Sequence, residues 1–178
     1  MDKDLIFMSK AFEQALLGFG KEEIPVGAVV VYENEIISAA HNESIHKTDP
    51  TSHAEIEAIR KAAKKMCNYR MPGAKMYVTL EPCLMCCGAL IHARFDKVIF
   101  STTDKKSGAV VSNGNFLEAN FTNHRVQFEQ GPLQEESSEL LKKFFKDNKK
   151  DEGNKVLRLM FEYITSRTPL SGKFVIAK

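Results

Sequence analysis

The sequence predicts an α/β fold, in which helices cover the faces of a sheet. Short β-rich runs alternate along the chain with segments whose apolar residues recur at helical spacing. That alternation is typical of a sheet with helices packed on it. The length of 178 residues suits one domain of this kind, and the chain contains no internal repeat or low-complexity tract.

The first part of the chain predicts a helix, a hairpin and a second helix. Apolar residues recur at helical spacing over 3–19, and Gly18 and Gly20 close that segment. The runs 24–32 and 35–41 are β-rich and flank the dipeptide Glu-Asn, which is typical of a hairpin. Segment 53–65 is strongly helical, because its two isoleucines and two of its alanines share one side.

The alternation continues through the second part. We expect a strand at 75–80, a helix at 82–93, strands at 97–101 and 124–130, and an amphipathic helix at 133–148. Pro82 suits the first position of its helix, because the amide hydrogen that proline lacks would have no intrahelical partner. A charged break then separates a domain at 1–150 from a C-terminal extension of unknown role at 151–178.

Composition excludes several classes of protein. Apolar residues make up 43% and charged residues 27% of the chain, as in ordinary globular proteins. The first residues are partly acidic and lack a small-residue cleavage site, and no apolar run is long enough to span a bilayer. We therefore expect a cytoplasmic protein without a membrane partner, in which thiols stay reduced and clustered cysteines indicate metal or redox chemistry. The net charge of +2 neither demands nor excludes nucleic acid.

Three of the four cysteines lie within five positions, at Cys83, Cys86 and Cys87. A Cys-x-x-Cys pair at a helix start can hold a metal, because residues i and i+3 share a face and thiolates are favoured near helix N-termini. His53, at another expected helix start, is a third ligand. A redox motif would usually follow the first strand of a thioredoxin-like unit, whereas this pair lies in mid-chain.

The fourth position of such a site separates two kinds of function. Structural zinc sites have four protein ligands, whereas catalytic sites have three and leave one position for water. Cys67 or Cys87 could close the site, and Cys83 with Cys87 is an alternative ligand pair on one helix face. We favour Cys83 and Cys86, with Cys87 as a small buried residue.

Glu55 has two interpretations. Ser52 and Glu55 fit a capping box, in which the glutamate only satisfies a helix terminus. Alternatively, Glu55 lies beside the metal and carries protons. On a regular helix, residues i and i+2 diverge by about 200°. His53 and Glu55 can therefore meet one metal only if it lies beyond the helix end.

These residues resemble a known family. His53-Ala54-Glu55 followed by Pro82-Cys83-x-x-Cys86 is the signature of zinc-dependent nucleobase deaminases. From about Met8 to Phe145, the chain resembles the bacterial tRNA-specific adenosine deaminases, within the cytidine/deoxycytidylate deaminase superfamily. The matching stretches are PVGAVVV, HN at 41–42, DPTSHAEI, NYR, YVTLEPCLMC, GALIHAR, DKKSGA, NHRV and LLKKFF. The combination of DPTSHAEI, NYR and TLEPC-x-MC is more selective than the zinc signature alone.

The resemblance implies a fold and a reaction. The fold is a three-layer, cytidine-deaminase-like α/β structure with a central mixed five-stranded sheet, formed by a zinc-dependent deaminase domain at 1–150. The reaction is hydrolytic deamination of adenosine to inosine at wobble position 34 of a tRNA anticodon. By similarity, His53, Cys83 and Cys86 hold one Zn²⁺ per subunit, zinc-bound hydroxide attacks C6 of adenine, and Glu55 shuttles protons.

The resemblance also implies substrate contacts and partners. Asn42 matches a residue that binds the flipped-out base, and Val26 and Ala54 are expected to line the pocket. Asp104 is expected near a ribose 2′-hydroxyl, the group that distinguishes RNA from DNA. The expected partners are a tRNA anticodon stem-loop and a second copy of the chain, which forms a homodimer through the helix LMCCGALIH. The expected RNA contacts are Lys106, Phe144, Phe145 and Lys146.

Two rival functions remain at this stage. Relatives that deaminate a free base or nucleotide, of the guanine or cytosine type, share the zinc signature. A zinc-stabilised RNA-binding module without catalysis is the other rival, and it requires a closed site or an idle Glu55. The DPTSHAEI context and the Phe-Phe followed by lysine favour tRNA, and the intact His-x-Glu argues against the module.

Overall fold

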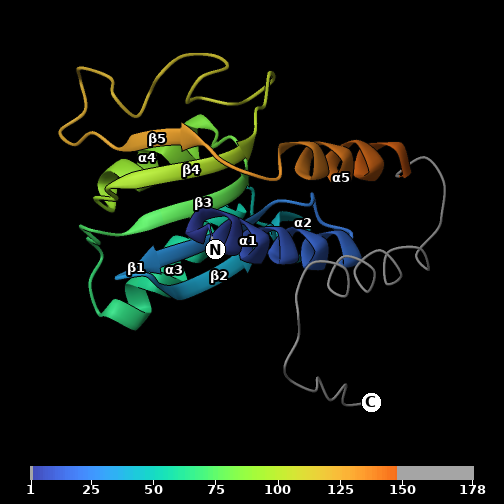
Figure 1. Cartoon of the computed structure of the whole chain (residues 1–178), viewed down its shortest axis with the longest axis horizontal. Helices are drawn as coiled ribbons and strands as arrows, with labels where there is room; N and C mark the ends of the chain where they lie inside the picture. The colour runs from blue at the N-terminus through green and yellow to red at the C-terminus, as the bar shows by residue number, and fades with distance from the viewer. Residues whose placement is uncertain (1, 148–178) are drawn as a thin grey trace.

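The computed structural model describes residues 2–147, and the expected extension at 151–178 lies outside them. Five strands form one sheet in the order β2-β1-β3-β4-β5 (Figure 1). Their bounds are β1 (Gly27–Tyr32), β2 (Glu35–His41), β3 (Lys75–Leu80), β4 (Lys97–Thr102) and β5 (Gln127–Gln130). β1 pairs antiparallel with β2 and β3, whereas β3, β4 and β5 are parallel. The sheet is therefore mixed and five-stranded, as expected.

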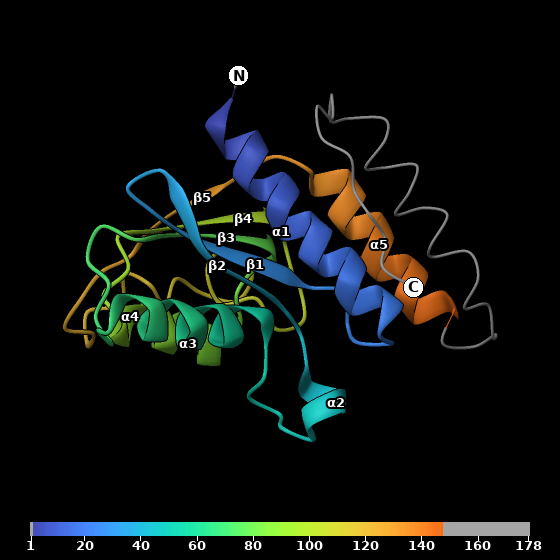
Figure 2. The ribbon, with the colours of Figure 1, turned by 90° about the horizontal axis from the view of Figure 1, so that it is seen from below.

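Helices cover both faces of the sheet. They are α1 (Lys3–Gly20), α2 (Ser44–Lys47), α3 (Ala54–Met66), α4 (Leu84–His92) and α5 (Gln134–Asp147). Figure 2 shows α1 and α5 on one face and α3 and α4 on the other, which makes three layers. Among the described residues, no helix has the length and apolar character needed to cross a bilayer.

The side chains of the strands alternate between two hydrophobic cores, one on each face of the sheet. On β1, Ala28 and Val30 belong to the core under α3 and α4, whereas Val29 and Val31 belong to the core under α1 and α5. Successive side chains of a strand point to opposite faces, so a strand with helices on both sides must be apolar at every position. This explains why the sequence GAVVVY has no polar alternation.

The hairpin between β1 and β2 confirms the expected turn. Glu33 and Asn34 both have positive φ, at 50° and 64°. Two successive residues in this region make a type I′ turn, which matches the twist of the flanking strands. The expected strand at 24–32 begins later, at Gly27, and the expected strand at 124–130 is shortened to β5.

One helix start differs from the expectation in a way that matters for the site. Pro82 is not the first residue of its helix, because α4 begins at Leu84 and Cys83 is its N-cap with extended backbone angles of φ −75° and ψ 172°. Pro82 instead lies in the segment that joins β3 to α4, where its carbonyl accepts a hydrogen bond from the Ala109 N–H. α2 is a four-residue helix that the sequence analysis did not predict.

The parallel strands place the next residues at one edge of the sheet. Leu80, at the end of β3, pairs with Thr102 at the end of β4, and the N–H of Glu81 donates to the Thr102 carbonyl. Ligand sites in α/β sheets form outside the carboxyl ends of such strands. The residues that follow Leu80 and Thr102 therefore occupy the position where a site is expected.

Candidate active site

Two helix starts bring the predicted metal ligands together. His53 is the N-cap of α3 and Cys83 is the N-cap of α4, and both have extended backbone angles. Cys86 is the third residue of α4. Because His53 stands outside the helix, the divergence between i and i+2 on a regular helix does not separate it from Glu55. A metal held by His53 would therefore lie beyond the helix end, where the sequence analysis required it.

The three donor atoms form a nearly regular triangle. The distances are 3.7 Å from Cys83 Sγ to His53 Nδ1, 3.6 Å from Cys83 Sγ to Cys86 Sγ, and 3.6 Å from Cys86 Sγ to His53 Nδ1. In a tetrahedral zinc site with Zn–S of about 2.3 Å and Zn–N of about 2.0–2.1 Å, donors lie about 3.6–3.8 Å apart. The cluster is therefore compatible with a metal ion in both chemistry and spacing.

The other two cysteines lie apart from this triangle. Cys87 is buried, and its Sγ faces the carbonyls of Pro82 and Ala109 at 3.8 Å each. Cys67 is exposed at the end of α3. The alternative ligand pair of Cys83 with Cys87 is thus wrong, because Cys87 points about 100° away from Cys86 around the helix. In the described part of the chain, no fourth histidine, cysteine or carboxylate joins the cluster.

The pKa shifts of the three candidate ligands favour metal binding by Cys83. A hydrogen bond from the Cys86 thiol, together with His53, lowers the pKa of Cys83 to about 4 against the opposing effect of burial. Donation to Cys83 and burial raise the pKa of Cys86. The hydrogen bond with Cys83 likewise raises the pKa of His53. Cys83 is therefore a thiolate at neutral pH, the form in which cysteine binds metals.

Glu55 lies beside the triangle and is almost completely buried, with 4% of its surface exposed. Burial raises the pKa of its carboxyl group. The capping-box interpretation is wrong, because the N-cap of α3 is His53. The Ser52 N–H donates to the Asp49 carbonyl, and its hydroxyl donates to Asp49 Oδ2. Glu55 therefore does not form a capping box with Ser52.

The triangle opens into a cavity of about 810 Å³. His53, Glu55 and Cys83 lie in its wall, and Cys86 is buried behind them. The opposite wall consists of the segment that follows β4 and one face of α5. The other residues of the lining are Ile24, Val26, Asn42, Leu80, Glu81, Thr102, Thr103, Asp104, Lys105, Lys106, Ser107, Ser138, Leu141, Lys142, Phe145 and Lys146.

Asn42 is fixed by the start of α3. Its side-chain Oδ1 accepts a hydrogen bond of 2.8 Å from the Ala54 N–H, and its own N–H donates to the Val26 carbonyl. With the oxygen engaged, the NH₂ group of this buried side chain is the one available to a ligand. Ala54 is fully buried and does not line the cavity, so the expectation that it contacts substrate is replaced by a role in holding Asn42.

Two adjacent phenylalanines of α5 have different roles. Phe145 is exposed and lines the cavity, next to Lys146. Phe144 is buried and packs edge-on against Phe19 of α1, with ring centroids 5.9 Å apart. Successive residues on a helix point about 100° apart, so both cannot face the cavity. Phe144 anchors α5 to the core, and the expected RNA contact at this position is not supported.

Some lining residues were missed by the sequence analysis. Leu141 and Lys142 are two of them, and each lies four residues before an expected contact, Phe145 and Lys146, and so shares its face of α5. That spacing was the available signal for a basic and apolar wall. Glu81 was also missed, although it directly precedes Pro82-Cys83.

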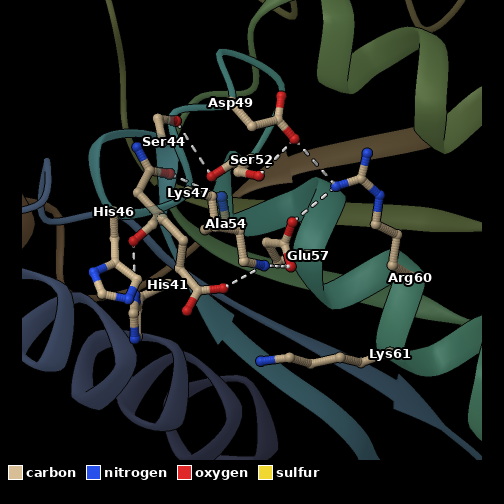
Figure 3. A network of polar contacts seen from close by, with 12 residues as sticks. His41, Ser44, His46, Lys47, Asp49, Ser52, Ala54, Glu57, Arg60 and Lys61 are labelled. Carbon is tan, nitrogen blue, oxygen red and sulfur yellow. Dashed lines mark hydrogen bonds and ion pairs between the residues drawn. The ribbon is translucent and has the colours of Figure 1, made fainter.

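A polar network supports the segment between β2 and α3, which carries Asn42 and His53 (Figure 3). Asp49 accepts hydrogen bonds from the N–H and hydroxyl of Thr51 and from the Ser52 hydroxyl. These bonds lower the pKa of Asp49 to about 2. In Figure 3, Arg60 lies between Asp49 and Glu57, at 3.8 Å and 2.9 Å from their carboxylate oxygens. The network ties this segment to the exposed side of α3.

Several known proteins resemble this chain in sequence and in structure. Residues 1–149 match the MafB19-like deaminase family model. A tRNA-specific adenosine deaminase of Aquifex aeolicus is 51% identical over 140 residues, which cover 79% of this chain and 92% of that protein. One from Bacillus subtilis is 38% identical over 150 residues, which cover 84% and 93%.

A solved structure agrees in fold over nearly its whole length. It comes from work on A-to-I editing by tRNA:A34 deaminases at the wobble position of transfer RNA. The TM-score is 0.75 at 36% sequence identity, with 77% of this chain and 99% of that chain covered. The mixed sheet between two helical layers is thus the cytidine-deaminase-like fold that was expected. The chain belongs to the MafB19-like deaminase family and, within it, to the tRNA-specific adenosine deaminases.

Proposed function

We propose that the protein is a zinc-dependent hydrolase that converts adenosine to inosine at wobble position 34 of a tRNA anticodon and releases ammonia. The observation that carries this proposal is the His53, Cys83 and Cys86 triangle beside a buried Glu55, at the base of a large cavity. Three protein ligands, and not four, are typical of a catalytic zinc site. The identity to tRNA-specific relatives supports the substrate.

The donor set favours zinc. Two thiolates and one imidazole are soft and borderline ligands that select zinc over calcium or magnesium. His53, Cys83 and Cys86 would hold one ion per subunit. When bound, the ion lowers the pKa of a coordinated water to about 7 and so supplies a nucleophile at neutral pH.

Glu55 handles the protons of the reaction. Its carboxyl group lies in the cavity wall next to the ligands, and burial raises its pKa towards the range of a general acid–base group. Glu55 takes a proton from the attacking water and delivers protons to the adenine ring nitrogen and to the departing amino group. Water and adenosine are consumed, and inosine and ammonia are formed.

Asn42 orients the base. The Ala54 N–H occupies its Oδ1, so the NH₂ group donates to an acceptor on the purine or its ribose. Val26 is buried in the cavity wall and packs against the base. A base that reaches this depth must leave the anticodon stack, as nucleobase deaminases require.

The outer part of the cavity accommodates RNA. Lys106, from the segment after β4, and Lys146, from α5, both line the cavity and place positive charge near phosphates, and Phe145 offers a ring for stacking. Asp104 contacts a ribose 2′-hydroxyl. These roles support the anticodon stem-loop as the partner, and an enzyme that modifies tRNA acts in the cytoplasm.

The α4 face is assigned to a second copy of the chain. Leu84 and Phe121 are exposed large apolar residues, at 57% and 81% of their surface, beside a groove of about 330 Å³. Gly88 adds open space on the same helix. An apolar patch of this kind is typical of an interaction site. We propose a homodimer through this face.

The test combines reaction and specificity. The protein is incubated with an anticodon stem-loop that carries adenosine at position 34, and inosine is measured by nuclease digestion and mass spectrometry. Glu55→Gln should lower the rate by at least about a hundredfold, because a general acid–base group is lost. Glu57→Gln, the same change two residues further along α3, should remain active.

Free adenosine, guanine and cytosine are assayed in parallel. Turnover of a free base without inosine in the stem-loop would move the protein to the free-base deaminases. Bound zinc with no conversion of any substrate would instead favour a non-catalytic RNA-binding module.

A further inference from the structure

Glu81 is a buried carboxylate that accepts five hydrogen bonds. Only 2% of its surface is exposed. Oε1 accepts from the N–H groups of Val110, Val111 and Ser112 at 3.0, 2.7 and 2.9 Å. Oε2 accepts from the Asp104 N–H at 3.0 Å and from the Ser112 hydroxyl. A buried charge persists only when it is matched in this way, so these contacts are a constructed feature of the fold.

The five donors lie at the two ends of one segment, 104–112. Asp104 begins this segment, whose residues 104–107 line the cavity, and Ser112 ends it outside the lining. A single side chain on the segment between β3 and α4 therefore closes a loop of nine residues that has no strand or helix of its own. Without these bonds, the N–H groups of the loop would be left to solvent, and the loop could adopt many conformations.

The loop is wound tightly around this carboxylate. A Cβ atom on Gly108 would overlap the Glu81 carboxyl group and lie 2.6 Å from the Asp104 carbonyl oxygen. Gly108 donates to that carbonyl at 2.9 Å and pairs with Cys83 in a single antiparallel bridge. The Ala109 N–H donates to the Pro82 carbonyl. Glycine is needed at 108 because backbone and carboxylate approach each other closely there.

The loop presents its other side to the cavity. Asp104, Lys105, Lys106 and Ser107 line the wall that faces α5. Asp104 Oδ1 accepts the Lys106 N–H at 2.9 Å, so the orientation of Asp104 also sets the turn that carries Lys106. The metal ligands and Glu55, in contrast, are positioned by the starts of α3 and α4. The 104–107 wall therefore depends on Glu81, whereas the reacting groups depend on the helix starts, and the two parts meet at the bridge between Gly108 and Cys83.

We propose that Glu81 is a positioning residue that holds the 104–107 wall in the form that binds the nucleic acid, and that it acts on substrate binding and not on the chemical step. This proposal rests on the proposed function of the cavity. It assigns specificity for RNA to a side chain whose hydrogen bonds all go to protein atoms.

Glu81→Gln tests this proposal by replacing one carboxylate oxygen with an NH₂ group. A glutamine can keep its oxygen toward Val110, Val111 and Ser112, but its NH₂ group then faces the Asp104 N–H, and two donors cannot bond. The Asp104 end of the loop is released while the other end stays anchored. Glu118→Gln, the same change at an exposed site further along the connection to β5, is the matched control.

Two readouts are compared. For the stem-loop substrate, Glu81→Gln should raise KM about tenfold or more, because a hydrogen bond to a charged acceptor is lost, and leave kcat within about twofold. Zinc content should equal that of the wild type. Amide hydrogen exchange at 104–107 should become faster, and Glu118→Gln should match the wild type in every measurement.

Other outcomes overturn the proposal. An unchanged KM in Glu81→Gln is one such outcome, and a loss of kcat at unchanged KM is another. A loss of zinc is the third, and it would mean that Glu81 supports Cys83. If Glu81→Gln does not fold, Ser112→Ala takes its place and should raise KM about threefold, and an unchanged KM there counts against the proposal. If the wild type forms no inosine, the proposed function fails. Hydrogen exchange still tests the role of Glu81 in that case. If Glu81→Gln leaves the exchange rate at 104–107 unchanged, the proposal that Glu81 holds this wall is rejected.

Discussion

At the scale of single residues, Glu57 shows how the segment before the metal ligand is held. Its side chain is only 6% exposed and accepts hydrogen bonds from Lys47 at 2.6 Å and Arg60 at 2.9 Å. Burial raises the pKa of Glu57, but the two cations outweigh it, and the net pKa is lowered. A carboxylate with a lowered pKa stabilises the fold above its unfolded pKa and loses that contribution as pH falls through the folded value.

This predicts a pH-dependent effect of Glu57→Gln. Both cations are substantially exposed, at 40% and 51%, so solvent screening limits the loss in unfolding free energy at pH 7 to about 1 kcal/mol. The difference from wild type should close as pH falls below about 4.3, where the unfolded carboxylate takes up a proton. Urea denaturation followed by circular dichroism between pH 7 and 3 measures it. Glu35→Gln, at the exposed start of β2, should follow wild type, and a gap that does not narrow between pH 5 and pH 3 would contradict the argument.

Residue roles were predictable where local spacing determines them. His53, Cys83 and Cys86 follow from helix-start geometry, which the sequence shows directly. Phe144 and Phe145 could not be separated, because nothing local says which of two neighbours on a helix faces the core. The role of Glu81 was inaccessible for another reason. Its partners lie 23–31 positions downstream in a segment without periodicity.

At the scale of elements, periodicity predicted every strand and every long helix. It failed at α2, whose four residues are too few to show a period. The start of α4 was also placed too early, at Pro82. The preference for proline at the first helical position takes no account of the candidate metal site. Cys83 is extended at the N-cap, and this conformation aims its side chain at His53.

The end of α3 provides a prediction at this scale. Cys67 closes the helix in the left-handed region, at φ 51° and ψ 31°, and the N–H groups of Cys67 and Asn68 donate to the carbonyls of Lys64 and Ala63. This is a Schellman motif, in which glycine is preferred because a Cβ is strained there. The unfolding free energy of Cys67→Gly should therefore be about 1 kcal/mol larger than that of Cys67→Ala. Chemical denaturation of both variants measures the difference, and equal stabilities would show that the strain is absent.

At the scale of the whole molecule, the candidate site joins parts that are far apart in sequence. The segment between β2 and α3 supplies His53, and the start of α4 supplies both cysteines, Cys83 as the N-cap and Cys86 from the helix itself. α3 and α4 lie on the same face of the sheet (Figure 2), so a metal at their starts would link two helices of one layer. α5 returns over the carboxyl ends of the strands and forms the far wall of the cavity. Under the proposed function, the same ligands would serve both the chemistry and the stability of this layer.

Metal removal should consequently destabilise the whole domain. A ligand that binds only the folded state stabilises it by RT ln(1 + [L]/Kd), which is about 4 kcal/mol at a thousandfold excess over Kd. For a chain of this length, that corresponds to a decrease in Tm of roughly 10 °C when a chelator removes zinc, and added zinc should restore it. Calorimetry with and without chelator measures the shift. Cys86→Ser should abolish the response, because a ligand is lost, whereas Cys67→Ser should keep it, because Cys67 is exposed and lies outside the triangle. A response that depends on Cys67 would mean a closed, four-ligand site, and the proposal of a catalytic centre would then be wrong.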